Sequence, residues 1–132
     1  MIKITKEFTA EIAHRLHNHP GKCQNIHGHS YRFQVTVCGF EGRVNSVTGM
    51  VMDFSKLKSI MEFHIGKWDH SLLLYELDPL VPILQNVPGI NLQLFPEIPT
   101  AENMAKYIGE SLECESVKVW ETDTSYAEWE CK

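Results

Sequence analysis

The chain has 132 residues, of which 43% are hydrophobic, so it can bury one core but has no room for a second domain of ordinary size. A formal net charge of −5, with Lys and Arg scattered along the chain, argues against nucleic-acid binding, which needs clustered positive charge. No apolar run is long enough for a signal peptide or a membrane span, and the four cysteines show no paired spacing, so we expect a reduced, cytoplasmic protein without a membrane partner.

Two long strands are predicted at the start of the chain. From Ile2 to His14 apolar side chains occupy nearly every even position, which is typical of a half-buried strand and places His14 on its apolar face. The next run alternates in the same way. Its buried face comprises His27, His29, Tyr31, Phe33, Val35 and Val37. The polar segment 15–26 contains Pro20-Gly21 and predicts a loop between antiparallel strands, with Cys23 on that loop.

Helices are predicted in the middle of the chain. Polar residues at 53–55 favour a helix start, and apolar residues then recur at helical spacing as far as Trp68. A second helix is expected from Thr100, a good N-cap, to Leu112. Between them, a short helix near 78–79 and a short strand over 91–95 are weaker predictions. Two strands, 117–121 and 127–131, end the chain around a turn at 122–124. The expected fold is α+β, with helices on one face of the sheet.

Three histidines converge in this arrangement. His27 and His29 project from the same face of one strand, and His14 can reach them from the antiparallel partner. Any one of them alone is better explained as an ordinary core or surface residue. Together they bury polar groups at the end of a hydrophobic stripe without evident partners, which is costly unless something binds them. Catalytic zinc commonly takes three protein ligands and keeps one position open, so the set predicts a zinc site.

Three further features accompany the histidines. Cys23 lies on a loop that returns to them, and is either a proton-transfer base, a fourth metal ligand or an inert thiol. Asp69-His70 is either a carboxylate–imidazole relay or a helix-end cap. Glu121 shares a face with Val117 and Val119, so it either meets a ligand with adjacent N–H groups or reaches solvent at the strand end.

The sequence resembles the family of 6-pyruvoyl-tetrahydropterin and 6-carboxytetrahydropterin synthases along nearly its whole length. The motifs that carry the resemblance are Phe8-Thr9-Ala10-Glu11-Ile12-Ala13-His14, Cys23-Gln24-Asn25-Ile26-His27-Gly28-His29-Ser30-Tyr31, Gly49-Met50-Val51-Met52-Asp53-Phe54, Trp68-Asp69-His70, Pro99-Thr100-Ala101-Glu102-Asn103 and Trp120-Glu121-Thr122. Any one could occur by chance, whereas together they are highly specific.

The resemblance implies a tunnelling fold: an antiparallel four-stranded sheet with two main helices packed on one face, whose strands close into an oligomeric barrel. It implies trimers or hexamers of identical chains with active sites between subunits. In that family pattern, Zn2+ is held by His14, His27 and His29. Cys23 is then the general base, Asp69 and His70 its relay, and Glu121 the pterin anchor, and Thr100 contributes to the pterin pocket.

Two activities divide the family. Three residues separate Cys23 from His27, a spacing that resembles the 6-carboxytetrahydropterin synthases of queuosine and 7-deazapurine biosynthesis. The expected reaction converts 7,8-dihydroneopterin triphosphate to 6-carboxy-5,6,7,8-tetrahydropterin with loss of triphosphate and acetaldehyde. The alternatives are the pyruvoyl-forming synthase, which eliminates triphosphate without carbon–carbon cleavage, and a non-catalytic zinc module. Near the histidines in sequence, the candidate cations for the triphosphate are Arg15, His17, His19 and Lys22.

Overall fold

A six-stranded sheet forms the centre of the computed structural model, which describes residues 1–132, and its strand order is β4-β3-β1-β2-β5-β6. The strands are β1 (Lys3–His14), β2 (His27–Cys38), β3 (Ser71–Tyr75), β4 (Leu92–Phe95), β5 (Ser116–Thr122) and β6 (Ser125–Glu130). The α+β class is confirmed. The expected antiparallel sheet of four strands is incomplete, because β1, β2, β5 and β6 pair in that way but β3 and β4 add to the β1 side in parallel.

Strand β3 is the element that sequence periodicity does not reveal. It lies between β1 and β4, and three consecutive leucines, Leu72 to Leu74, occupy its centre. A short parallel strand covered on both sides has no polar face, so it shows a continuous apolar run instead of alternation. Such a run is equally typical of a buried helix, and only the pairing of β3 with Ile12–His14 identifies it.

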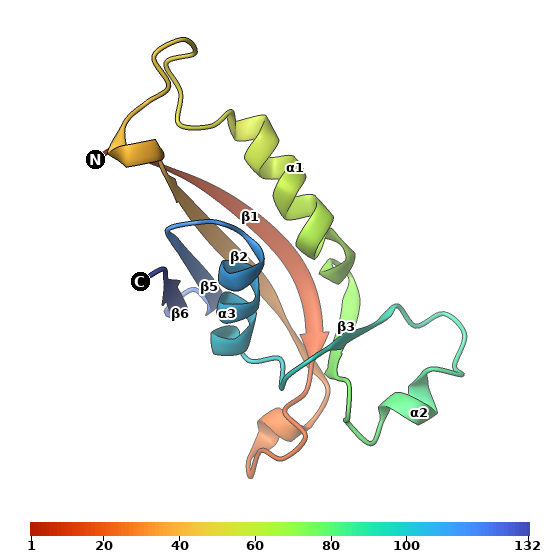
Figure 1. The fold of residues 1–132 in the computed structure, drawn as a ribbon. Coiled ribbons are helices and arrows are strands. Elements are labelled where there is room, and N and C mark those ends of the chain that lie inside the picture. The colour runs from red at the N-terminus through yellow and green to blue at the C-terminus, as the bar shows by residue number, and fades with distance from the viewer.

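Two main helices, α1 (Phe54–Ile65) and α3 (Ala101–Ser111), pack on the same face of the sheet (Figure 1). They begin at the predicted N-caps, Asp53 and Thr100, whose side chains accept backbone N–H groups. A third helix, α2 (Val81–Leu84), lies within the β3–β4 connection, apart from the two main helices (Figure 1). Three short 3-10 turns complete the elements: η1 (Lys22–Gln24), η2 (Phe40–Gly42) and η3 (Gly66–Trp68). No helix is both long and apolar enough to cross a membrane.

The core lies between the helices and the inner face of the long strands. Side chains from both helices and from β1, β2 and β5 form one buried cluster. Glycine is needed at Gly109 of α3, because a Cβ there would overlap the ring of Trp129 on β6. His14 belongs to this buried face and is among the most completely buried side chains, so its site is anchored by the core.

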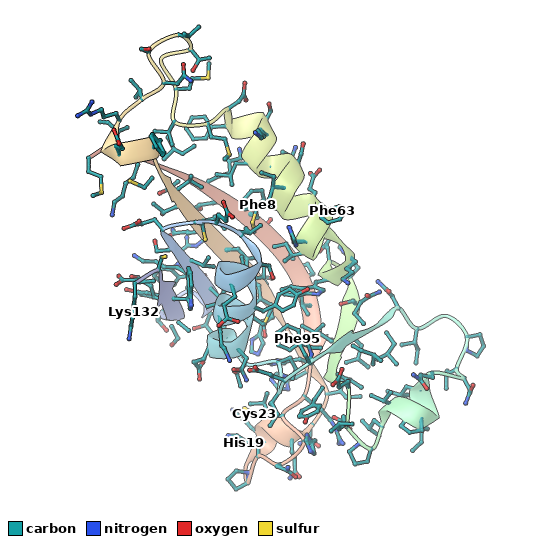
Figure 2. The ribbon with its side chains drawn as sticks, viewed as in Figure 1. Phe8, His19, Cys23, Phe63, Phe95 and Lys132 are labelled. Carbon is teal, nitrogen blue, oxygen red and sulfur yellow. The ribbon has the colours of Figure 1, made fainter.

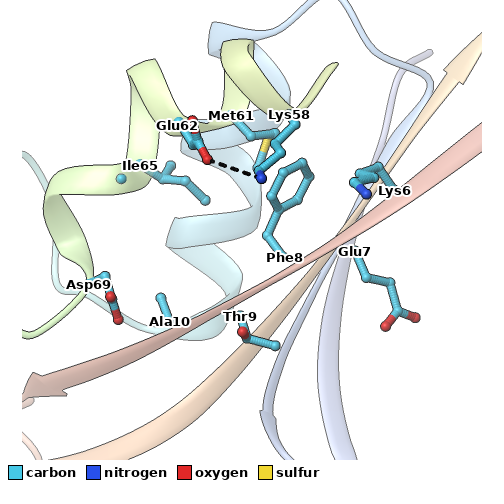
Figure 3. A pocket seen from close by; sticks show the side chains of 11 residues that line it. Lys6, Glu7, Phe8, Thr9, Ala10, Lys58, Met61, Glu62, Ile65 and Asp69 are labelled. Carbon is cyan, nitrogen blue, oxygen red and sulfur yellow. Dashed lines mark ion pairs between the residues drawn. The ribbon is translucent and has the colours of Figure 1, made fainter. Parts of the chain in front are cut away.

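Several strand edges remain without a partner strand, among them the outer edge of β4. Strand β3 pairs with β1 only over Ile12–His14, so the earlier part of β1 borders a groove under α1 that is lined by Phe8, Met61 and Ile65 (Figure 3). The outer edge of β6 is likewise unpaired. Closure of such edges into an oligomeric barrel stays a prediction, since the structure contains one chain.

Candidate metal centre

The three histidines lie together where β1 ends and β2 begins. His14 is the last residue of β1 and is paired with His27, the first residue of β2, while His29 follows on the same face. The ring centroids form a nearly equilateral triangle with sides of 4.6, 4.9 and 5.2 Å. One nitrogen from each ring lies within 4.8 Å of the others, so the three could ligate a single metal ion.

Backbone carbonyls orient two of these rings. The Nδ1 atom of His14 lies 2.8 Å from the carbonyl oxygen of Pro99, and that of His27 lies 2.7 Å from the carbonyl oxygen of Asn25. Because a carbonyl can only accept, each Nδ1 carries the proton and donates it. The Nε2 lone pairs of His14 and His27 then face each other at 3.1 Å. This second-shell pattern is the one that prepares imidazoles for a metal.

The ring of His29 has a nitrogen without a partner. The Nε2 atom of His29 is buried and has no hydrogen-bond partner. An unpaired buried nitrogen next to two inward lone pairs is costly, and a cation held between the three removes that cost. Neutral imidazole nitrogens suit Zn2+ and several other divalent transition metals, so the residues present fit a metal of this class.

Burial favours the neutral forms of His14 and His29. Burial lowers the pKa of His14, and the hydrogen bond to Pro99 only partly opposes this. Burial also lowers the pKa of His29, against the raising effect of the Glu121 charge. Beneath them the hydroxyl of Tyr31 lies 3.2 Å from Nδ1 of His14, and burial, together with the negative charge of Glu121, raises the pKa of that phenol. Deprotonated, neutral imidazoles are the form that binds metal.

Glu121 lies against two of the three histidines. It projects from β5 on the same side as the buried Val117 and Val119, and it is not directed away into solvent. Its Oε1 atom lies 3.4 Å from Nε2 of His14 and 3.3 Å from Nε2 of His29. The carboxylate is 33% exposed, so it stands at the boundary between the buried ligands and solvent.

Cys23 lies near the histidine ends of the strands but outside the ligand group. It is half-buried on η1, in the loop beyond β1 and β2 (Figure 2), and its carbonyl accepts the N–H of Leu16. The group of mutually close ligand atoms consists of the three histidines and does not include the Cys23 sulfur. This arrangement argues against a closed structural site with Cys23 as the fourth ligand.

Asp69 and His70 form a carboxylate–imidazole pair. Asp69 Oδ2 lies 3.0 Å from Nδ1 of His70, and Asp69 Oδ1 accepts the N–H of Glu11 at 2.8 Å. The hydrogen bonds from Glu11 and His70 lower the pKa of Asp69. His70 adopts a left-handed backbone with φ of 56°, an uncommon conformation outside glycine that is frequent at functional sites. Asp69 therefore fixes the orientation of His70.

This pair does not meet the metal centre of its own chain. His70 lines a shallow hollow with Glu11, Gly28, His29 and Ser30. In β1 and β2, positions 11, 28 and 30 alternate with the histidine positions, so they face the side of the sheet that carries no helix. Most of the residues around His70 therefore face away from the side on which the histidine side chains meet.

Two other candidates have structural partners. Thr100 caps α3 by accepting the N–H of Asn103 at 3.1 Å, and it follows Pro99, whose carbonyl holds His14. Arg15 donates two hydrogen bonds of 2.7 and 2.6 Å to the buried Asp78, so its charge is already neutralised. Arg15 is therefore less free than Lys22, which is exposed on the η1 loop, to bind a triphosphate, and the triphosphate ligands stay a prediction.

Sequence reasoning did not identify the groups that support the histidines. Tyr31 lies on the same stripe as His27 and His29, and that position was the only available signal. The carbonyls of Pro99 and Asn25 carry no side-chain signature. Pro99 lies 85 residues from His14 in sequence, and only the folded chain brings the two together.

Comparison with known proteins places this geometry in context. The sequence profile of the 6-pyruvoyl tetrahydropterin synthase family matches residues 3–131. The chain is 37% identical to the 6-carboxy-5,6,7,8-tetrahydropterin synthase of Haemophilus influenzae over 98% of this chain and 99% of that protein. The protein of that name from a Synechocystis species is 40% identical over 96% and 91%, respectively. A solved structure of Caenorhabditis elegans 6-pyruvoyl tetrahydropterin synthase superposes with a TM-score of 0.72 at 26% identity, covering 99% of this chain and 96% of that one.

Proposed function

This chain belongs to the 6-pyruvoyl tetrahydropterin synthase family of enzymes, and from that premise we propose that it forms 6-carboxy-5,6,7,8-tetrahydropterin. The substrate would be 7,8-dihydroneopterin triphosphate, which reacts with water and releases triphosphate and acetaldehyde, as a lyase step in queuosine and 7-deazapurine biosynthesis. The observation that carries the proposal is the convergence of three histidine nitrogens and one inward carboxylate. The names of the relatives at 37% and 40% identity support this product over the pyruvoyl one.

The residues divide the proposed chemistry among them. A zinc ion held by His14, His27 and His29 would polarise the oxygens of the substrate side chain and so acidify it. Glu121, with a carboxylate at the open side of the cluster, would accept the paired N–H groups of the pterin edge. Cys23 would transfer a proton as the general base.

The relay would be supplied by a neighbouring subunit. Within one chain no hydrogen bond or ion pair joins His70 to the three histidines, and Glu11, Gly28 and Ser30 beside it face the side of the sheet without helices. A homo-oligomer, trimeric or hexameric, would bring the Asp69–His70 pair of one subunit to the metal centre of another. The unpaired edges of β1 and β6 support such assembly, because joining them continues the sheet from chain to chain.

The pyruvoyl-forming reaction is the second candidate. It is favoured by the similarity of this chain, in fold and at 26% sequence identity, to the C. elegans protein. Both reactions consume the same substrate, but only the lyase breaks a carbon–carbon bond. The deciding experiment therefore incubates purified, zinc-loaded protein with 7,8-dihydroneopterin triphosphate and quantifies acetaldehyde and 6-carboxytetrahydropterin. One acetaldehyde per substrate consumed is expected. Consumption of substrate without acetaldehyde would reject the lyase.

A further inference from the structure

Glu121 lies at an irregularity in its strand. Strands β5 and β6 pair residue by residue until Trp120, which is opposite Tyr126, but the next pair joins Thr122 to Ser125. Glu121 is therefore the unpaired residue of a bulge, and bulges are frequent next to functional sites. Its carboxylate lies against two of the three histidines.

Most of the atoms that meet there are acceptors, and the one hydroxyl among them, that of Tyr31, lies 3.4 Å from Nε2 of His14 and can donate a single proton. Nδ1 of His14 donates to the Pro99 carbonyl, so its Nε2 presents a lone pair to the Glu121 carboxylate. His29 has no hydrogen bond at Nε2 although Glu121 Oε1 is only 3.3 Å away, which shows that the contact lacks hydrogen-bond geometry. One hydroxyl proton cannot satisfy the lone pairs of two imidazoles and a carboxylate, so a cation between them would lower the cost of their approach.

The separations match those of ligands that share a metal. Four ligands placed at about 2.0–2.1 Å around a tetrahedral ion lie about 3.3 Å from one another. The distances from Glu121 Oε1 to the Nε2 atoms of His14 and His29 are 3.4 and 3.3 Å, and His14 and His27 are 3.1 Å apart. Glu121 lies against His14 and His29 and outside the group of three mutually close histidine nitrogens, so its side chain, one-third exposed, must move toward His27 to become the fourth ligand.

We propose that Glu121 is a displaceable fourth metal ligand in the substrate-free protein. The inference rests on the proposed function for the identity of the displacing ligand. A carboxylate that accepts two N–H groups from a pterin edge turns its lone pairs away from the metal, so the same side chain cannot satisfy both partners. Binding of the pterin edge then opens the coordination position for the substrate side chain. Without a pterin the position stays closed to water and other small ligands.

The test measures the metal and requires no turnover. The protein is loaded with Co2+, whose visible absorption reports its ligands, and the wild type is compared with Glu121→Gln. The matched control is Glu128→Gln, which removes an equal charge from a residue of β6 paired with Lys118. Glu121→Gln is expected to weaken Co2+ binding roughly tenfold or more and to alter the absorption band, while Glu128→Gln leaves both unchanged. Equal affinities and spectra for all three proteins would overturn the proposal.

A second measurement needs no variant. Titration of the Co2+-loaded wild type with 7,8-dihydroneopterin, which lacks the triphosphate, is expected to change the absorption band as the carboxylate leaves the metal. A saturable complex with an unchanged band would also overturn the proposal. Neither result depends on product formation, so a protein that makes a different product can still show the ligand exchange. A protein that forms acetaldehyde can equally fail to show it.

Discussion

The two halves of the candidate site differ sharply in how the chain holds them. The histidine half is preformed: His14 is 1% exposed, and backbone carbonyls fix the rings of His14 and His27. In the Asp69–His70 half, the His70 ring pairs only with the Asp69 carboxylate, and the His70 side chain is 78% exposed. Burial and second-shell hydrogen bonds prepare a metal site within one chain, whereas an exposed relay needs further surroundings before it can transfer a proton without competition from water.

Mixing two inactive variants is the strongest test of this division. His27→Ala removes a ligand and His70→Ala removes the relay, and each is expected to lower turnover about 10²–10⁴-fold. If the halves come from different subunits, randomly mixed oligomers recover about one quarter of the wild-type activity, because one site in about four then joins two intact halves. The measurement is turnover after the two proteins are co-expressed.

The matched control for this mixture combines His27→Ala with Cys23→Ala. Cys23 lies on the loop between β1 and β2, in the same half as His27, so no subunit pairing restores a complete site and activity should stay low. Equal recovery in both mixtures would contradict the assignment of Cys23 to the metal half. Absence of recovery with His70→Ala, in mixed oligomers that are shown to form, would contradict a shared site.

The same contrast explains how much could be predicted from the sequence. Strict alternation along β1 and β2 predicted that His14, His27 and His29 share one buried face, and the antiparallel register brings His14 opposite His27. Alternation also placed Glu121 beside Val117 and Val119. These predictions succeed because a two-residue period is set locally, by backbone geometry alone.

The second half depends on non-local pairing, which no short-range pattern encodes. The position of Asp69 and His70 follows from the parallel alignment of β3 against Ile12–His14, and β3 has no polar face to reveal it. The Arg15–Asp78 pair likewise joins residues 63 apart, so Arg15 could be read from the sequence only as a free cation. The bulge at Glu121 is likewise visible only in the pairing of β5 with β6.

The Arg15–Asp78 pair should account for part of the rigidity of the metal half. Arg15 directly follows His14, and the Asp78 side chain is 1% exposed. Breaking a buried ion pair by removing one partner costs several kcal/mol, so Asp78→Asn is expected to lower the free energy of unfolding by about 3 kcal/mol, the lower end of that range, because Arg15 is partly solvated. Urea unfolding measures this change in free energy, with Asp123→Asn in the exposed β5–β6 turn as the matched control. An equal decrease in unfolding free energy in both variants would contradict a special role for the pair.

The pH dependence of this effect has a defined sign. Burial alone would raise the pKa of Asp78, but hydrogen bonds from Arg15 and from the N–H of Leu80 outweigh it, so the pKa lies below its ordinary value. Folding then favours the ionised carboxylate. Its stabilisation is complete at neutral pH, above the unfolded pKa of about 3.9, and is lost as the pH falls through the lower folded pKa. Wild type and Asp78→Asn should therefore differ less in unfolding free energy at acidic pH than at neutral pH. A difference that does not change with pH would contradict this prediction.

Thr100 offers the smallest effect and separates support of the metal half from contact with substrate. Its hydroxyl caps α3, and the preceding Pro99 carbonyl orients His14, so Thr100→Ala should cost about 1 kcal/mol of unfolding free energy and weaken metal binding slightly. Thr100→Ser keeps the capping oxygen and should preserve both properties. A residue that contacted the pterin would instead raise KM in Thr100→Ala while the unfolding free energy stayed at its wild-type value. Urea unfolding and substrate titration of the two variants distinguish these outcomes, because a cap acts through the fold and a substrate contact does not.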